Sequence, residues 1–192
     1  MRLGRVLYPI HALGPGERLG LWLQGCERKC PGCANPELQP FEGKEVPKEM
    51  VLAMCRAAIK DYALTGISVT GGEPLLQAEE LVWLLDGLKD FCDDVLLFTG
   101  FTLNEIREEK KEVYERLLER VSVLVDGEYR QEENHGEILK GSSNQIIHFL
   151  NENKKEQYEE YIKTDRRIID SFAAQDGIVS VGIHPAGFLS KE

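Results

Sequence analysis

Short hydrophobic runs alternate along the chain with longer segments in which hydrophobic positions recur every three or four residues. The short runs predict buried β-strands, and the amphipathic segments predict helices. Strands are expected at residues 18–24, 66–70, 94–98, 121–125 and about 145–149. Helices are expected at residues 47–62, 77–91 and 103–118. Residues 1–17 show neither pattern clearly and are expected to be irregular.

This order of elements places a helix between successive strands. Such βαβ units have right-handed crossovers and build a parallel sheet that binds ligands at the carboxyl ends of its strands. The sequence therefore predicts an α/β fold, an incomplete (β/α) barrel of mainly parallel strands, in residues 1–150. Residues 151–192 are interpreted as an extension of the same domain. It would hold a charged helix at residues 154–163 and a β-ribbon, with strands near residues 167–169 and 178–181 and a turn at residues 175–177.

Charge and hydropathy limit the partners and the cellular location that can be expected. The chain has 33 acidic and 23 basic residues and a formal charge of -10, which repels a nucleic-acid backbone, so nucleic acid is not an expected partner. The longest hydrophobic runs are far short of the roughly 18 residues that span a bilayer, so no membrane segment is expected. The basic N-terminus does not lead into the apolar stretch of a signal peptide, and we expect a cytoplasmic protein.

Three of the five cysteines lie within eight residues, as Cys26, Cys30 and Cys33. Pro31 and Gly32 separate the last two and indicate a loop, which follows the strand at residues 18–24. An odd number of clustered cysteines favours metal ligation in a reducing compartment over disulfides. Iron–sulfur clusters normally take four thiolates, so three in one loop would leave one iron open to another ligand.

Zinc is the alternative occupant of such a loop, and a zinc site needs a fourth ligand. Cys55 and Cys92 lie on the inward faces of predicted helices, where a free cysteine is commonly a small hydrophobic residue. His11 has no second histidine or cysteine at a short spacing. The residues alone favour an iron–sulfur cluster over zinc and leave both open.

A second segment of chemical interest, Thr70-Gly71-Gly72-Glu73-Pro74, ends the strand at residues 66–70. Two glycines allow the backbone to approach a ligand closely, and a carboxylate beside them can pair with an ammonium group. Taken alone, the segment could equally be a strand-to-helix turn with its proline at the start of the helix.

In this order, the cysteine loop and the GGEP segment resemble the signature motifs of the radical S-adenosylmethionine (SAM) superfamily, and the resemblance covers residues 12–150. It implies a 4Fe–4S cluster on the three loop cysteines, with the amino and carboxyl groups of SAM on the open iron. It also implies that residues 70–73 position SAM, and that Glu73 and nearby main-chain oxygens receive the ammonium group.

Residues 14–16, 98–102, 124–129 and 140–145 resemble one group of this superfamily, the activating proteins of glycyl-radical enzymes such as anaerobic ribonucleotide reductase. The resemblance adds Asp126, Ser142 and Asn144 as candidate SAM contacts. Asp126 could instead cap its own turn, and the other two could simply close a loop. The implied reaction cleaves SAM reductively to a 5′-deoxyadenosyl radical that takes hydrogen from a glycine of the partner. An electron donor such as flavodoxin or ferredoxin is implied as well.

Two features depart from that group. Residues 34–36, after the third cysteine, lack the aromatic residue that many relatives carry. The tail, residues 151–192, exceeds the compact activases, which makes residues 178–184 a candidate partner-docking element and leaves the partner open. Two other functions therefore remain as alternatives: a radical SAM maturase for another protein, peptide or small molecule, and a non-catalytic iron–sulfur or zinc module.

Overall fold

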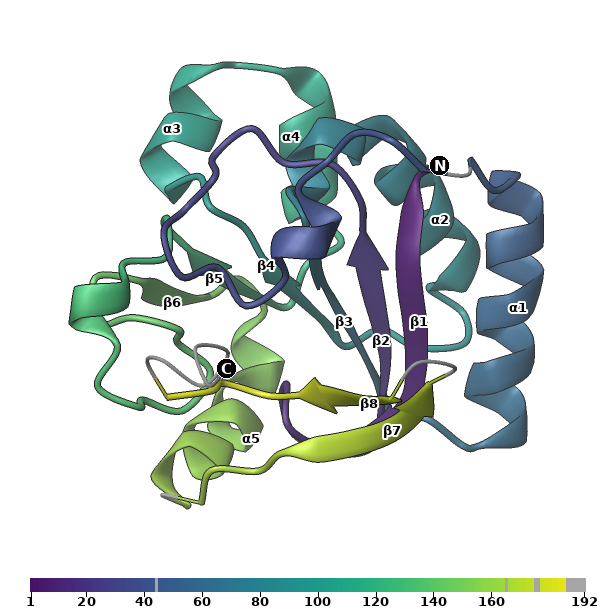
Figure 1. The fold of residues 1–192 in the computed structure, drawn as a ribbon. Coiled ribbons are helices and arrows are strands. Elements are labelled where there is room, and N and C mark those ends of the chain that lie inside the picture. The colour runs from purple at the N-terminus through teal and green to yellow at the C-terminus, as the bar shows by residue number, and fades with distance from the viewer. Residues whose placement is uncertain (44, 165, 175–176, 186–192) are drawn as a thin grey trace.

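Six strands form one open sheet through the middle of the molecule (Figure 1). The computed structural model describes residues 1–43, 45–164, 166–174 and 177–185. In their order across the sheet, the strands are β1 (Leu3–Ile10), β2 (Arg18–Leu23), β3 (Gly66–Gly71), β4 (Val95–Phe98), β5 (Val123–Asp126) and β6 (Ile146–Phe149). Strands β2 to β5 are parallel, and β1 and β6 run antiparallel to their neighbours. The expected α/β fold with mainly parallel strands is confirmed.

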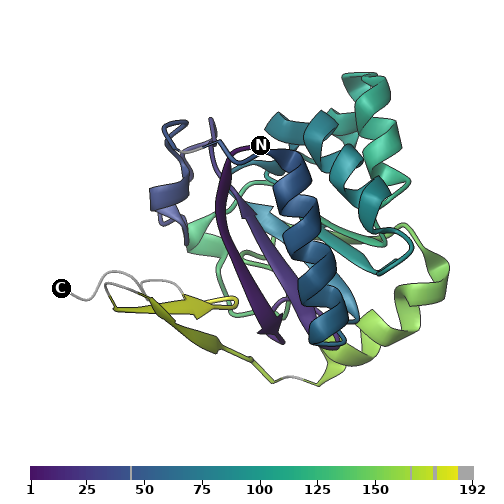
Figure 2. The ribbon, with the colours of Figure 1, turned by 90° about the vertical axis from the view of Figure 1, so that its right-hand side faces the viewer.

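The crossover helices lie together on one side of the sheet, and the loop after β2 lies on the other side (Figure 2). The helices are α1 (Lys48–Asp61), α2 (Ala78–Leu88), α3 (Leu103–Glu108) and α4 (Glu112–Leu118). Three short 3-10 helices occupy the loops, at Pro36–Leu38, Pro74–Gln77 and Gln131–Glu133. In the described part of the chain, no helix is both long and hydrophobic enough to cross a membrane.

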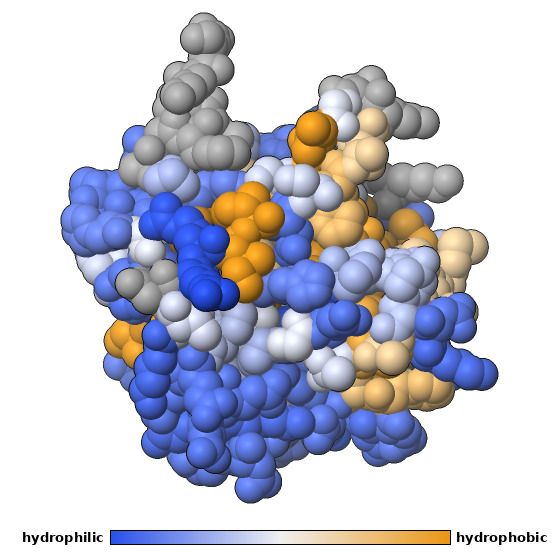
Figure 3. Space-filling view, turned by 90° about the horizontal axis from the view of Figure 1, so that it is seen from below, coloured by the Kyte–Doolittle hydropathy of each residue, from blue (hydrophilic) through white to orange (hydrophobic). Residues whose placement is uncertain are grey.

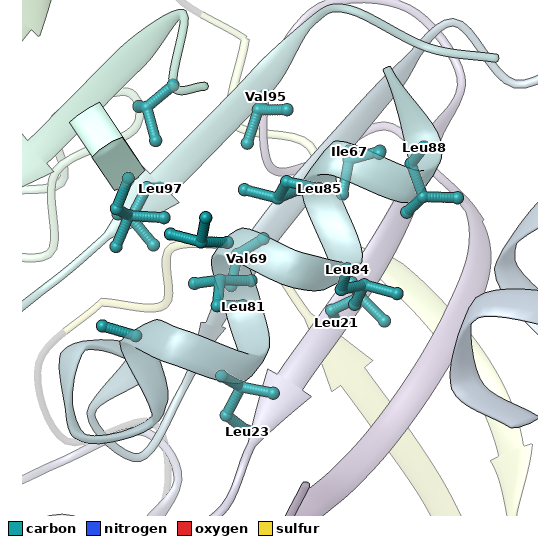
Figure 4. Close-up of a cluster of buried hydrophobic side chains, with 14 of the residues drawn as sticks. Leu21, Leu23, Ile67, Val69, Leu81, Leu84, Leu85, Leu88, Val95 and Leu97 are labelled. Atoms are coloured by element: carbon teal, nitrogen blue, oxygen red, sulfur yellow. The ribbon is translucent and has the colours of Figure 1, made fainter. Parts of the chain in front are cut away.

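Both faces of the parallel strands are buried, which explains why these strands read as nearly continuous hydrophobic runs. Ile67, Val69 and Leu97 pack against the helices, together with leucines of α2 (Figure 4). Leu96 and Val123 belong to a second cluster with Tyr158. Successive residues of a strand point to opposite faces, so each strand contributes to two cores.

Two predicted elements were wrong. The N-terminal segment is not irregular but forms β1, whose pairing with β2 shifts register twice, between Leu3 and Arg5 and between Leu7 and Ile10. These irregularities break the alternation by which a strand is recognised. The single helix expected at residues 103–118 is two helices, because the exposed, charged residues 107–112 bury no side chain and Lys110 adopts a left-handed φ of 49°.

The C-terminal segment forms the expected helix and ribbon. Helix α5 (Glu152–Lys163) is followed by an antiparallel pair, β7 (Asp170–Ala174) and β8 (Gly177–Val181). Strand β7 begins at residue 170, directly after the predicted strand ends at residue 169, and residues 175–176 of the predicted turn lie outside the described residues. Seen from below, this end of the molecule is mostly hydrophilic, with hydrophobic residues in small patches (Figure 3).

A fully buried ion pair closes the amino ends of the parallel strands. Arg18 Nη1 donates to Asp94 Oδ2 at 2.7 Å, Arg18 Nε donates to Ser68 Oγ at 2.7 Å, and the Tyr158 hydroxyl donates to Asp94 Oδ1 at 2.8 Å. Tyr158 belongs to α5, so the pair fastens the C-terminal helix to the sheet. Removing one member of a buried pair leaves the other charge uncompensated, which makes this cluster structurally important.

Candidate functional site

A cavity of about 600 Å³ lies at the carboxyl ends of the parallel strands. This is where an α/β sheet of this topology binds its ligands. The loops after β2, β3, β4 and β5 form most of its wall, and residues 180–185 at the end of the C-terminal ribbon contribute a further part. The polar and ionisable side chains in the wall include Cys26, Arg28, Cys30, Cys33, Thr70, Glu73, Thr99, Tyr129, Gln131, Gln145, Ser180 and His184.

The three thiols of the cysteine loop face this cavity, each half-buried. Gly32, with a φ of 69°, lets the loop turn between the last two. Burial raises the pKa of the Cys26 and Cys30 thiols, and hydrogen bonds from main-chain N–H groups partly oppose it, among them one from Tyr129 to Cys30. Among the described residues no three potential ligands are already drawn together as tightly as around a bound metal. The three cysteines thus line the cavity, but their thiols are not gathered around a common centre.

The other candidate ligands lie elsewhere. Cys55 is buried in the helix layer, where desolvation raises its pKa to about 12, and Cys92 is buried in the same core. His11 Nδ1 lies 3.2 Å from the carboxylate of Asp170. None of the three lines the cavity. The donors present therefore fit a cluster held by three thiolates with one open iron better than a four-coordinate zinc site.

The two glycines after β3 let this loop lie directly against the cysteine loop. The main-chain N–H of Gly72 donates to the carbonyl of Leu23 at 2.7 Å, and that of Glu73 donates to Gly25 at 2.8 Å. A Cβ on Gly72 would lie 2.3 Å from the carbonyl oxygen of Gly25, and Gly71 has a φ of 119°. Because these two N–H groups are already used, the Gly72–Glu73 part of the loop offers a ligand acceptor groups in preference to donors.

Glu73 is a buried carboxylate with 2% of its surface exposed. Its Oε1 accepts hydrogen bonds from the Leu75 N–H at 3.0 Å and the Thr99 hydroxyl at 2.7 Å, and its Oε2 accepts one from the Gly100 N–H at 2.8 Å. Burial raises its pKa, and these three donors oppose the shift. A carboxylate has about four acceptor positions, so one remains for a donor in the cavity.

Asp126, the first of the three further candidates, is buried beside the cavity but does not line it. Its Oδ2 accepts a hydrogen bond from the Leu103 N–H at 2.6 Å and lies 2.9 Å from His148 Nε2. The next residue, Gly127, does line the wall. Asp126 thus ties the start of α3 to the end of β5.

Ser142 and Asn144 also lie behind the wall. The hydroxyl of Ser142 accepts from the Arg130 N–H at 3.1 Å, and the Asn144 amide donates to the Glu128 carbonyl at 2.9 Å. Both side chains therefore hold the segment after β5 in place. Gln145, the next residue, is the one that reaches the cavity.

Sequence reasoning did not single out Arg28, and it gave residues 178–184 only as a candidate docking element, not as part of the cavity wall. Arg28, within the cysteine loop, lies with its Cζ 4.3 Å from the centre of the Phe101 ring and forms long ion pairs with Glu105 at 3.6 Å and Glu128 at 3.9 Å. Its position between Cys26 and Cys30 could have marked Arg28 as a residue of the site from the sequence alone. Ser180 comes from a ribbon whose position over the cavity depends on contacts remote in sequence.

Comparison with known proteins matches residues 12–148 to the family described as a 4Fe-4S single cluster domain. The anaerobic ribonucleoside-triphosphate reductase-activating protein of Escherichia coli K12 is 32% identical over 155 residues, covering 74% of this chain and 96% of that protein. The protein of the same name from Vibrio cholerae is 35% identical over 150 residues, covering 73% and 94%. The pyruvate formate-lyase-activating enzyme of Streptococcus mutans is 29% identical over 139 residues, covering 70% and 52%.

Fold, cysteine loop and family match together define a radical SAM enzyme whose cofactors are a 4Fe–4S cluster and SAM. Within that class, the chain belongs to the family of glycyl-radical-enzyme activating proteins.

Proposed function

We propose that this chain activates a glycyl-radical enzyme and that its partner is an anaerobic ribonucleotide reductase. The observation that carries the proposal is one cavity that holds the thiols of Cys26, Cys30 and Cys33 together with the GGEP carboxylate of Glu73. The names of the relatives that match the chain over most of their own length support this choice of partner.

When bound, a 4Fe–4S cluster and SAM would supply a 5′-deoxyadenosyl radical by reductive cleavage of SAM. The chain's own residues orient the reactants. The three thiolates would hold the cluster, and the close packing of Gly71 and Gly72 on the cysteine loop would keep the proposed SAM site next to it. The radical would take a hydrogen atom from the Cα of a glycine of the partner and so become 5′-deoxyadenosine.

We assign the ammonium group of SAM to the remaining acceptor position of Glu73 and to main-chain carbonyls after β3. The bound cation would sit beside a carboxylate that Thr99 and Gly100 already hold in place, so little ordering is needed on binding. Thr70 lines the same wall and completes this subsite. Asp126, Ser142 and Asn144 do not line the cavity, and their proposed role is to support the segment that carries the wall residues Gly127 and Gln145.

An external electron donor must reduce the cluster, and flavodoxin and ferredoxin are the proposed classes. We place the reaction in the cytoplasm, because thiolate ligands persist best in a reducing compartment. The cysteine loop is only half-buried, so an external electron donor could approach it from the outside, which supports the proposal that one reduces the cluster.

The test is anaerobic reconstitution with iron and sulfide, followed by addition of SAM and a strong reductant. We expect iron to be bound, 5′-deoxyadenosine to be released and, with a candidate reductase present, a glycyl radical to be seen by electron paramagnetic resonance. Cys30→Ala should abolish all three, whereas Cys55→Ala, which removes a buried thiol outside the cavity, should retain them.

The alternatives give different results in the same experiment. Zinc binding without SAM cleavage would support a non-catalytic module. SAM cleavage with no radical on the reductase would support a maturase with another substrate.

A further inference from the structure

The C-terminal ribbon forms part of the cavity wall. Residues 180–185 line it opposite the cysteine loop, and Figures 1 and 2 show β8 on the side of β7 that is nearer to that loop. The stretch matched by the family model ends at residue 148, before the ribbon begins. The ribbon is therefore a part of this chain's site that the shared core does not supply.

Contacts with the core hold the ribbon in place. The carboxylate of Asp170 at the start of β7 accepts main-chain hydrogen bonds from His11 at 2.7 Å and Ala12 at 2.9 Å. Val181 at the end of β8 is 2% exposed and packs in a cluster with Leu13 and Trp22. The ribbon thus presents a fixed surface to the cavity.

Strand β8 has an open edge. In the described part of the chain it pairs with β7 and with no other strand, so alternate residues direct their N–H and C=O groups outward. Its sequence, Gly-Ile-Val-Ser-Val, contains no charged residue and no proline, and Ile178 is 77% exposed. Sheet edges are normally protected by charges, prolines or covering segments. In the part of the chain that the structure describes, none of these protects the edge of β8, and an edge of this kind that runs into a cavity is suited to pairing with an extended peptide.

We propose that the open edge of β8 binds the glycine-bearing segment of the partner enzyme as an added β-strand and so guides it into the cavity. This inference rests on the proposed function, from which it takes the partner. Main-chain pairing suits such a substrate, because a glycine offers no side chain to recognise and its Cα must come close to the cofactors. The same pairing would order an extended segment before it reacts.

The first test uses a capped nine-residue peptide with a central glycine flanked by alternating valine and threonine, added to the reconstituted protein with SAM under anaerobic conditions. Two versions carry N-methyl groups on two amides, one version on each edge of the peptide. We expect one methylated version to bind roughly 10-fold more weakly, the loss of two main-chain hydrogen bonds, and the other to bind like the parent. Hydrogen exchange should slow at residues 178–181 when the parent peptide binds.

Two matched variants extend the test to the protein. Ile178→Lys places a charge on the open edge at an exposed position and should weaken peptide binding several-fold, whereas Ile169→Lys, at a position that is 40% exposed and precedes β7, should not. Cleavage of SAM without peptide should be the same in both variants, so a failure of the ribbon inference can be distinguished from a failure of the proposed function.

Three results would overturn the inference: no binding of the parent peptide at millimolar concentration, equal binding of both methylated versions, or equal effects of the two lysine variants. A protein dimer that Ile178→Lys dissociates would also overturn it, by assigning the edge to a second copy of the chain.

Discussion

Replacing Glu73 by Gln separates the proposed ligand role of this carboxylate from its role in packing. The side chain keeps its size but loses its charge, and one of its two oxygens becomes an amide nitrogen. If the remaining oxygen keeps the Leu75 and Thr99 hydrogen bonds, the nitrogen faces the Gly100 N–H, donor against donor. One unsatisfied buried donor costs about 1–3 kcal/mol, and relief from burying a charge offsets part of this.

The effect on SAM should be larger than the effect on the fold. A hydrogen bond between the ammonium group and the carboxylate contributes about 1.5–3 kcal/mol, which corresponds to roughly 10- to 150-fold in affinity. Iron content should not change, because Glu73 is not among the proposed cluster ligands. Equilibrium dialysis of SAM against the anaerobically reconstituted protein, with iron analysis and thermal unfolding of the same samples, measures all three quantities.

Thr99→Val is the matched control. It removes one hydrogen bond to the same carboxylate and should cost a similar amount of stability, yet it leaves the charge in place. SAM affinity should then stay within about threefold of the parent value, well below the effect of losing a charge-assisted bond. Equal losses of affinity in Glu73→Gln and Thr99→Val would refute the assignment and leave Glu73 with a purely structural role.

Three further predictions concern the frame of the site. Arg18→Met should lower the free energy of unfolding, measured in urea, by about 3–5 kcal/mol, because it leaves the buried charge of Asp94 without its partner. Tyr158→Phe should lower the same free energy by less than half as much. Gly72→Ala should reduce the iron retained after desalting, since its Cβ would push the cysteine loop away, and unchanged retention would contradict the close packing. Burial lowers the pKa of His184 below 6.5, so its contribution to ribbon stability should be present above pH 6.5 and lost as the pH falls through the lowered value. Hydrogen exchange of β8 between pH 7 and 5 tests this, and His184→Asn should remove the dependence.

Most of the sheet could be predicted because buried parallel strands carry a strong local signal. Strands β2 to β6 were found where short hydrophobic runs indicated them. Strand β1 was missed because its register shifts break the alternation, and the break between α3 and α4 was missed because Lys110 lies in a run of charged residues that reads equally well as a solvated helix face.

Residue type and short spacing drew attention to the cysteine loop and the GGEP segment, and the structure brings both to one cavity. The sequence was less informative where long-range packing determines which side chains reach the cavity. Asp126 and Asn144 lie close in sequence to wall residues, yet their side chains turn into the supporting layer. Ser180 reaches the wall through contacts between the ribbon and residues more than a hundred positions away, which no local pattern contains.

The hydrogen bonds of Glu73 also bear on the two interpretations of the GGEP segment. A strand-to-helix turn accounts for the bond from the Leu75 N–H, which caps the first turn of the following 3-10 helix. It does not account for the bonds from Thr99 and Gly100, which come from the loop after β4. A neutral side chain could cap the helix without the cost of burying a charge. The contacts from the second loop, with one acceptor position left toward the cavity, support the proposed role of Glu73 as an acceptor for a cationic ligand.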